Sequence, residues 1–171
     1  HKEIVQLLLR HKEIDLNQST SDDNAMTPLC VACQNGYIEI VRCFLQHKEI
    51  DVNQHNYKNA TPLNMASFYS HVKIVRLLLQ QPNIDVNKKD NDCSPLANAE
   101  KQKNRAISKL LLDAGAECTL HEAVLWNNIY AVEICLNKND VNEVDENGRT
   151  SLHIAIENNY IEIIQYLLLV Y

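Results

Sequence analysis

Few residues in this chain of 171 residues could do chemistry, and they are scattered. Cys30 and Cys33 form a Cys-x-x-Cys pair, which is the spacing of half a zinc site or of a dithiol redox motif. A structural zinc site needs four ligands, and no second ligand pair with suitable spacing accompanies these cysteines. We therefore expect no metal site and interpret both cysteines as packing residues.

The other polar residues do not form a catalytic set. His121 and His153 have no matched nucleophile or acid, and Asp22-Asp23 stands in a turn-prone stretch where carboxylates are ordinarily solvated. Only three glycines occur, so a Gly-rich phosphate loop is excluded, and no His-Glu-x-x-His or Gly-x-Ser-x-Gly motif is present. The sequence predicts that the chain is not an enzyme and binds no cofactor.

The composition narrows the class of partner and the cellular setting. The chain is 46% hydrophobic and 22% charged, which favours a folded core over disorder. Its net charge of -6 argues against binding to nucleic acid or to an anionic membrane, and no run approaches the roughly 20 apolar residues of a membrane span. Six irregularly spaced cysteines are typical of a reducing, intracellular compartment.

These residues belong to a sequence that repeats itself. The phrase "VQLLLRHKEIDLNQ" at 5–18 returns as "VRCFLQHKEIDVNQ" at 41–54. A second phrase, Thr-Pro-Leu or a variant of it, recurs in steps of 34, 33, 24 and 32 residues, with its leucine at Leu29, Leu63, Leu96, Leu120 and Leu152. Three residues after each leucine stands an alanine: Ala32, Ala66, Ala99, Ala123 and Ala155.

Each repeat predicts two helices followed by an extended hairpin. The Thr or Ser of the phrase supplies an N-cap oxygen, and Pro is tolerated in the first helical turn because that amide has no helical partner. Further on, apolar residues at i, i+1, i+4 and i+5, such as Ile74, Val75, Leu78 and Leu79, form one stripe on a second helix. An Asp-Val/Leu-Asn phrase and a polar stretch close most repeats.

This pattern resembles the ankyrin repeat, with its period of about 33 residues and its Thr-Pro-Leu-His-x-Ala signature. "TPLCVACQNGYIEIVRCFLQ" and "TSLHIAIENNYIEIIQYLL" show the resemblance most clearly. It implies an all-α solenoid of stacked helix-turn-helix repeats with β-hairpin fingers. We expect a single array over 1–171 with repeats at 1–26 (incomplete), 27–60, 61–93, 94–118, 119–149 and 150–171. The incomplete first repeat suggests a fragment of a longer protein.

The fourth repeat departs from the pattern. Glu100 and Ser108 stand where other repeats have small or apolar residues, and "DAGAECTLHEA" passes almost directly into the next repeat. We expect that this repeat lacks its finger and that its contact with the fifth repeat is weak, because such arrays are stabilised by nearest neighbours. The resemblance also implies that His121 and His153, at the signature histidine position, hydrogen-bond between neighbouring repeats.

The resemblance implies a monomeric protein–protein interaction module whose partner binds the concave face, formed by finger tips and exposed first-helix positions. Exposed aromatic residues beside polar ones have the composition of binding hot spots. The candidate partner-binding residues are Tyr57, Lys58, Phe68, Tyr69, Lys101, Leu125 and Trp126. The alternative is that these aromatic residues pack on the adjacent repeat.

Two other functions are compatible with the sequence. The array could be a regulatory or targeting segment of a larger enzyme or channel. It could also be a substrate, because asparagines of the Asp-Val-Asn phrase in ankyrin repeats can be hydroxylated by a dedicated dioxygenase; the targets would be Asn17, Asn53, Asn87 and Asn142. An adaptor or scaffold would act in the cytoplasm, and a pathogen effector in the host cytosol.

Overall fold

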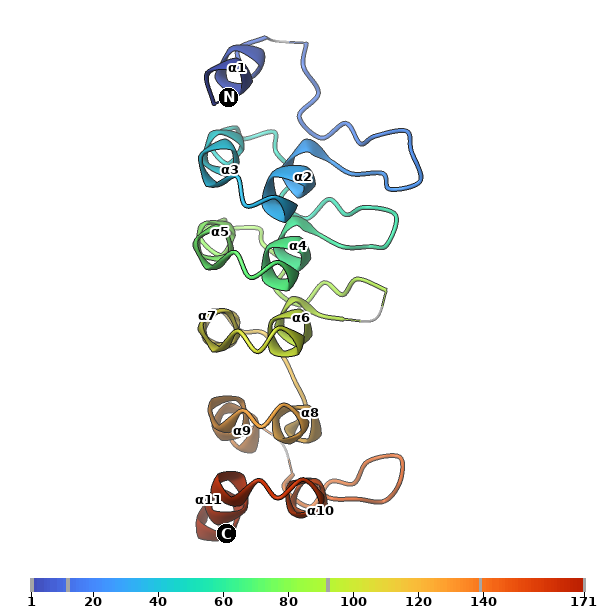
Figure 1. Cartoon of the computed structure of the whole chain (residues 1–171), viewed down its shortest axis with the longest axis vertical. Coiled ribbons are helices and arrows are strands. Elements are labelled where there is room, and N and C mark those ends of the chain that lie inside the picture. The colour runs from blue at the N-terminus through green and yellow to red at the C-terminus, as the bar shows by residue number, and fades with distance from the viewer. Residues whose placement is uncertain (1, 12, 92, 139, 171) are drawn as a thin grey trace. The chain divides into compact units, whose positions relative to one another are not determined.

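A computed structural model describes residues 2–11, 13–91, 93–138 and 140–170 (Figure 1). In these residues the secondary structure consists of helices and one isolated antiparallel bridge, between Val144 and Thr150. The helices are α1 (Lys2–Leu8), α2 (Pro28–Gln34), α3 (Ile38–Phe44), α4 (Pro62–Phe68), α5 (Val72–Leu78), α6 (Pro95–Lys101), α7 (Arg105–Asp113), α8 (Leu120–Leu125), α9 (Ile129–Leu136), α10 (Ser151–Glu157) and α11 (Ile161–Val170). The expected all-α class is confirmed.

The chain divides into two compact units, which we describe separately. Unit 1 ends at Ala116 and holds α1 to α7, and unit 2 begins at Glu117 and holds α8 to α11. The boundary falls close to that between the fourth and fifth predicted repeats. Residues 114–119 alone connect α7 to α8, whereas residues 45–61 connect α3 to α4. The connection at the boundary therefore has the short length that the 24-residue step predicts.

The first helices of unit 1 begin as the sequence predicts. The Thr27 side chain accepts a hydrogen bond from the Cys30 amide at 3.1 Å, and Thr61 and Ser94 cap α4 and α6 in the same way. Proline follows each cap and occupies the first helical turn. The turn into each second helix needs a residue with positive φ. Gly36 takes this role at +73° after α2.

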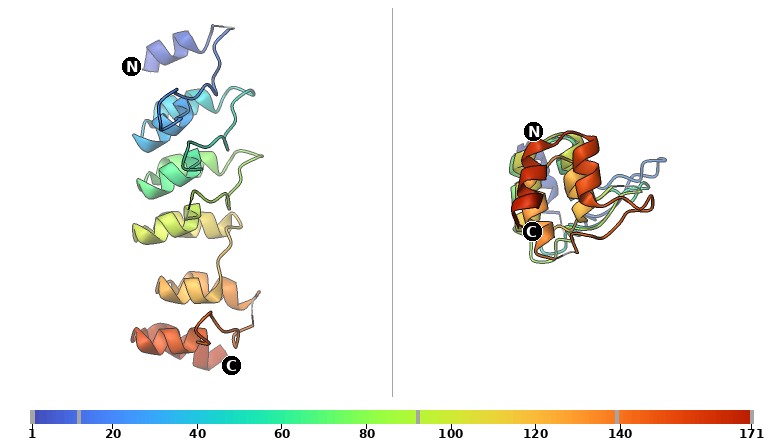
Figure 2. Two further views of the ribbon diagram at one scale, coloured as in Figure 1. Left: turned by 90° about the vertical axis from the view of Figure 1, so that its right-hand side faces the viewer. Right: turned by 90° about the horizontal axis from the view of Figure 1, so that it is seen from below.

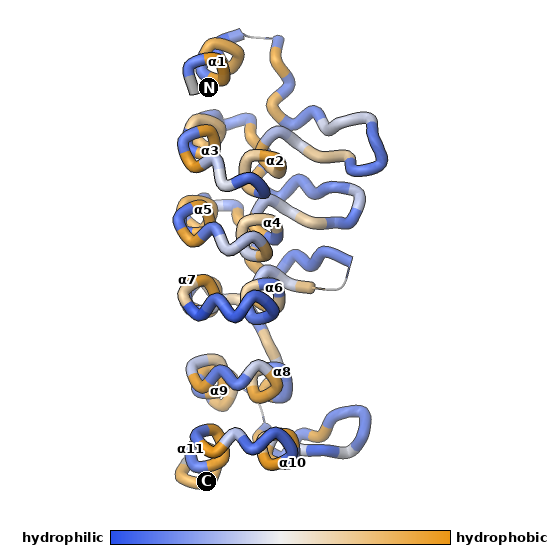
Figure 3. Tube along the Cα trace, viewed as in Figure 1, coloured by the Kyte–Doolittle hydropathy of each residue, from blue (hydrophilic) through white to orange (hydrophobic). Residues whose placement is uncertain are grey.

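Unit 1 is a stack of helix pairs in two rows (Figure 1). The first helices α2, α4 and α6 pack on one another, and α1, α3, α5 and α7 form the second row. Leu29, Leu63 and Leu96 are fully buried in the first row. The alanines of the signature are also buried, which lets helix backbones approach closely. Hydrophobic residues accordingly gather in the helices, and the fingers are mostly hydrophilic (Figure 3).

The fingers of unit 1 are hairpin-like loops that project from the first-helix side (Figure 2). In the finger at 51–60, the Asn56 amide donates to the carbonyl of Ala60 at 3.0 Å and closes the loop. Neighbouring fingers are joined along the stack, since the Tyr57 amide donates to Asn24 at 3.2 Å and the Lys58 carbonyl accepts from Asn91 at 3.0 Å. In the described part of unit 1 these bonds do not extend into a β-ladder.

Polar residues that break the repeat pattern have hydrogen-bond or ion-pair partners within α6 and α7, the helix pair of the fourth repeat. The Glu100 side chain is 1% exposed and forms an ion pair with Arg105, at the start of α7. The Ser108 hydroxyl donates to the carbonyl of Asn104 at 3.1 Å. A buried polar group costs little free energy when it is hydrogen-bonded, so these substitutions are compatible with a well-packed pair.

Unit 2 contains two helix pairs, α8–α9 and α10–α11, joined by the finger at 140–149. Nε2 of His121 lies 3.0 Å from the carbonyl oxygen of Arg149, at the base of that finger, and so links the two repeats. His153 has a different role: its Nδ1 accepts from the amide of Thr150 at 3.2 Å and caps α10. The inter-repeat bond expected at the signature histidine is therefore present for His121.

An acidic residue organises the finger of unit 2. Asp145 accepts hydrogen bonds from the Arg149 amide at 2.9 Å and from the Arg149 guanidinium at 2.8 and 2.9 Å. The Asn147 amide adds a further bond at 2.9 Å. These interactions favour the charged carboxylate, and they lower the pKa of Asp145 from 3.8 to about 2.

We expect Asp145→Asn to lower the melting temperature of unit 2 at neutral pH by a few degrees. The folded-state pKa lies below the ordinary value, so the carboxylate stabilises the fold fully above pH 3.8, and this contribution is lost as the pH falls towards 2. Trp126 is the only tryptophan of the chain, so its fluorescence follows the melting of unit 2. A difference from wild type that does not shrink between pH 4 and pH 2 would contradict this linkage, and Glu146→Gln, at an exposed neighbouring position, is the control.

Candidate interaction surface

Aromatic residues gather where α4 ends beside the finger at 51–60. Phe68 is the last residue of α4 and Tyr69 is its C-cap, and both are 44% exposed. Their rings meet edge to face, with centroids 5.2 Å apart. Tyr57, near the finger tip, is 51% exposed. We call Tyr57, Lys58, Phe68, Tyr69 and His71 the aromatic cluster.

The cluster is held in place by the preceding helix pair. Nε2 of His71 lies 3.0 Å from the carbonyl oxygen of Gln34, and the His71 and Tyr69 rings stack with centroids 6.4 Å apart. The amide of the Gln34 side chain donates to the Tyr69 hydroxyl at 3.5 Å. His71 also lies against Gly36, where a Cβ atom would come within 2.7 Å of the imidazole. Gly36 thus provides both the turn and the space for His71.

Lys58 gives the cluster a positive charge. Its ammonium group lies 5.3 Å from the centroid of the Tyr57 ring. Interaction with the Tyr57 hydroxyl raises the pKa of Lys58, and Tyr69 contributes in the same direction. The cluster therefore combines exposed aromatic faces with a fixed cation and two phenol hydroxyls. This composition suits a protein partner with apolar and acidic groups.

The other candidate binding residues lie elsewhere. Lys101, at the end of α6, occupies the repeat position of Phe68, and its ammonium group lies 2.6 Å from the sulfur of Cys93. Leu125 takes the equivalent place on α8 in unit 2 and is 52% exposed, whereas the adjacent Trp126 is half-buried. The structure thus brings together Tyr57, Lys58, Phe68 and Tyr69 in one cluster.

His71 is a member of the cluster that the sequence analysis missed. The repeat position of His71 is occupied by Tyr37 in the preceding repeat and by Asn104 in the next. The repeat pattern therefore does not predict a histidine, or a role for it, at this position. The ring becomes recognisable only from its contacts with Tyr69 and Gln34. Gly36, one repeat earlier, could have pointed to His71 in the sequence, because a residue without a side chain leaves room for the imidazole ring.

Two of the Asp-Val/Leu-Asn asparagines connect successive repeats. The Asn17 side chain donates to the Glu49 carbonyl at 2.8 Å and accepts from the Asp51 amide at 2.8 Å. Asn53 makes the same pair of bonds one repeat later, to Asn83 at 2.6 Å and from Asp85 at 2.9 Å. Both side chains therefore have a structural role, and their hydroxylation stays a prediction.

Asn87 and Asn142 make the local bond of the Asp-x-Asn phrase. The amide of each donates at 2.9 Å to the aspartate two residues before it, Asp85 and Asp140 respectively. The amides of Asn17 and Asn53 close the same Asx turn. The Asp-x-Asn phrase thus specifies a turn in all four repeats.

The Cys-x-x-Cys pair lies in the core. Cys30 and Cys33 are fully buried on α2, and burial raises the pKa of both thiols. Among the described residues, no group of three or more histidine, cysteine, aspartate or glutamate side chains could hold a metal ion. The burial of both cysteines on α2 agrees with the packing role expected from the repeat.

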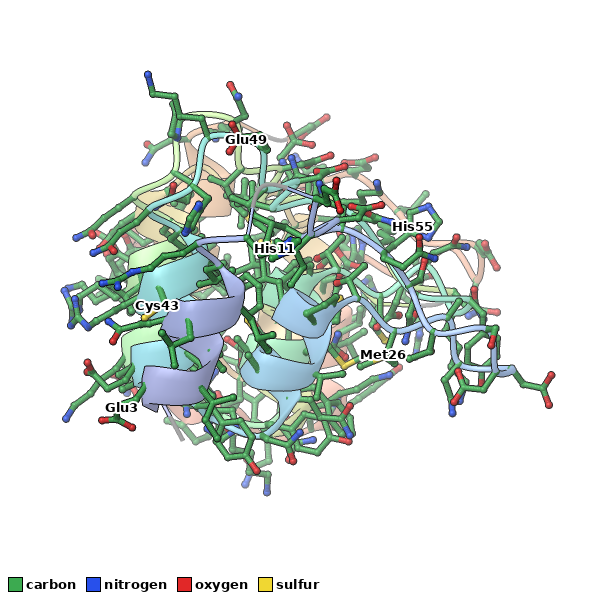
Figure 4. All side chains as sticks on the ribbon, turned by 90° about the horizontal axis from the view of Figure 1, so that it is seen from above. Glu3, His11, Met26, Cys43, Glu49 and His55 are labelled. Atoms are coloured by element: carbon green, nitrogen blue, oxygen red, sulfur yellow. The ribbon has the colours of Figure 1, made fainter. Side chains whose placement is uncertain are left out.

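An apolar groove of about 420 Å³ lies at the α1 end of unit 1. It is lined by side chains of α1, α2, α3 and the loop at 14–26, including Leu8, Met26 and Val31. Figure 1 shows α1 stacked on α3, and in the view from above Met26 lies beside α2, just before that helix begins (Figure 4). In the described residues, α1 packs on α3, and the groove lies beside this contact.

Comparison with known proteins agrees with this architecture. The family described as ankyrin repeats (3 copies) matches residues 1–90 and 58–121, and the family described as ankyrin repeats (many copies) matches residues 120–168. An ankyrin repeat protein of Rickettsia bellii (strain RML369-C) is 38% identical over 61 residues, which are 36% of this chain and 38% of that protein. In the part of the chain that the structure describes, no helix has both the length and the hydropathy needed to cross a bilayer. With its Thr-Pro-Leu caps, paired helices and projecting fingers, the chain belongs to the ankyrin-repeat family.

Proposed function

We propose that this chain is a non-enzymatic module that binds another protein through its finger tips and the exposed ends of its first helices. Ankyrin repeats are general protein–protein interaction modules, and the family match extends over most of the chain. The observation that carries the proposal is the aromatic cluster, where three rings and a cation are exposed together. Tyrosine is enriched among the residues that dominate binding energy at protein interfaces, and phenylalanine is enriched at such interfaces.

The proposed contact surface has a central and a peripheral part. Tyr57, Lys58, Phe68 and Tyr69 form the centre in unit 1. Their geometry is fixed before binding by the contacts of His71 and by the bonds between fingers, which lowers the entropy lost on association. Lys101, Leu125 and Trp126 are the remaining proposed contacts, each at the end of a first helix. In ankyrin arrays this face is the concave one.

We further propose that the module acts as a monomer inside the cell, as an adaptor, scaffold or effector. The acidic net charge and the irregular spacing of the six cysteines support this setting over a nucleic-acid or extracellular role.

A capture experiment tests the proposed surface. Partners of the native chain are collected from lysate and identified by mass spectrometry, and the affinity of each purified partner is then measured for a Phe68→Ala/Tyr69→Ala variant. Loss of two central hot spots is expected to weaken binding about 30-fold or more, equivalent to about 2 kcal/mol. Circular dichroism verifies that the variant remains folded.

Tyr37→Ala is the matched control, because Tyr37 is 52% exposed but borders the groove at the α1 end. Its partner affinity should equal that of wild type. A partner bound equally well by the aromatic-cluster variant would place the binding surface elsewhere. A Leu125→Ala/Trp126→Ala variant then tests the contribution of unit 2 separately.

A further inference from the structure

Two cysteines of unit 2 lie face to face. Cys118 stands in the extended stretch before α8, and Cys135 lies in the last turn of α9. Their sulfur atoms are 3.0 Å apart, and the Cys135 sulfur is also 3.2 Å from the carbonyl oxygen of Cys118. A disulfide bond is about 2.0 Å long, so bond formation requires the sulfurs to approach by only about 1 Å.

The pair also differs from the other cysteines in access and in charge environment. Cys118 is half-buried, whereas the other five cysteines are buried. The hydrogen bond with Cys118 lowers the pKa of Cys135, and the ammonium group of Lys138 acts in the same direction, against the effects of burial and of Glu122. Exposure and thiolate character both favour thiol–disulfide exchange.

We propose that Cys118 and Cys135 are a redox modification site, at which exchange with a low-molecular-weight disulfide forms a reversible intramolecular disulfide. The half-buried Cys118 is the residue that the reagent reaches, and the buried Cys135 is the resolving thiol. Cys30 and Cys33 are closer in sequence, but both are fully buried, and the bond of the Cys30 thiol is to the carbonyl of Gln54. Sequence spacing would thus select the wrong pair.

The reaction balances with the disulfide reagent as oxidant. The Cys118 thiolate attacks one sulfur of the reagent, its S–S bond breaks, and a mixed disulfide and one small thiol result. The Cys135 thiolate then attacks the Cys118 sulfur and expels the second small thiol. The two cysteines lose two electrons and two protons, and the reagent is reduced to two thiols, which carry these protons. Excess thiol reverses both steps.

The bridge would lock the α8–α9 pair. Cys118 immediately precedes Thr119, the N-cap of α8, whose capping box with Glu122 begins the helix. The disulfide would tie this start to the end of α9 and close the loop at 118–135. Such a closure limits the freedom of the unfolded chain, so the oxidised form should be the more stable one. A reducing compartment would make the bond transient and sensitive to oxidation.

The test uses the full chain equilibrated in mixtures of reduced and oxidised glutathione. Free thiols are then alkylated, and intact mass and peptide mapping locate the bonds. After alkylation we expect a product that carries four alkyl groups where the reduced protein carries six, with a single bridge between the peptides of Cys118 and Cys135. Cys118→Ser and Cys135→Ser should abolish this product, while Cys43→Ser, a control in unit 1, should retain it.

Mapping of the wild-type protein decides the proposal without relying on any variant. Separate glutathione adducts on Cys118 or Cys135, unmodified thiols at the most oxidising ratio, or a bridge between other cysteines would overturn it. Melting followed by Trp126 fluorescence tests the consequence for the fold. The melting temperature should rise by several degrees on oxidation and return on reduction, and an unchanged value would overturn the proposed locking of α8 and α9.

Discussion

Leu63→Ala is expected to lower the free energy of unfolding of unit 1 by about 2–5 kcal/mol. Leu63 is fully buried on α4, the first helix that packs against both α2 and α6. Truncation removes apolar contacts and leaves a cavity that the neighbouring helices can fill only in part. Because the contacts of a stacked array are those between neighbours, the loss acts on both sides of α4.

Urea unfolding followed by circular dichroism measures this change. The matched control is Leu7→Ala, since Leu7 on α1 is 65% exposed and its truncation should change the free energy of unfolding by no more than about 0.5 kcal/mol. Equal effects of the two leucine substitutions would contradict the described core.

Arg105→Ala is expected to cost about 2 kcal/mol in the free energy of unfolding. The substitution deprives the Glu100 carboxylate, whose side chain is 1% exposed, of its ion-pair partner. Removing one member of such a pair leaves a buried charge with incomplete compensation. Arg105 itself is 48% exposed, so water can replace part of the interaction. The expected loss of free energy of unfolding is therefore smaller than for a fully buried ion pair.

A double-mutant cycle isolates this interaction. Ser67 occupies the position equivalent to Glu100 on α4, so Glu100→Ser introduces a residue that the array already accepts at this place. In the Glu100→Ser background, Arg105→Ala should have almost no effect, which corresponds to a coupling energy of about 1–3 kcal/mol. Additive effects of the two substitutions would show that the pair does not stabilise α6 against α7.

The sequence alone was sufficient to predict the helical repeats. The period of Leu29, Leu63 and Leu96 marks the first helices because each leucine must enter the same stacked core, and all three are fully buried. Proline and the preceding Thr or Ser mark where these helices begin, since capping is a local interaction. The 24-residue step likewise predicted the short connection between α7 and α8.

The sequence could not show how the non-repeating residues are accommodated. Glu100 and Ser108 looked unfavourable in the fourth repeat, yet Glu100 pairs with Arg105 at the start of α7, and the Ser108 hydroxyl donates to the backbone carbonyl of Asn104. A repeat pattern reports what successive repeats share, whereas these interactions occur once. The Glu100–Arg105 pair depends on side chains that meet only when α6 and α7 pack.

By itself, the sequence thus determined the helix pairs and their order, because periodic burial and capping act over a few neighbouring residues. The tertiary structure decided which exposed residues meet. It brought the Tyr69 ring against His71 and the Gln34 side chain of the preceding repeat, and it brought Cys118 to Cys135 instead of pairing Cys30 with Cys33. Such contacts depend on the packing of helices and fingers that are distant along the chain, so they cannot be predicted from the spacing of residues in the sequence.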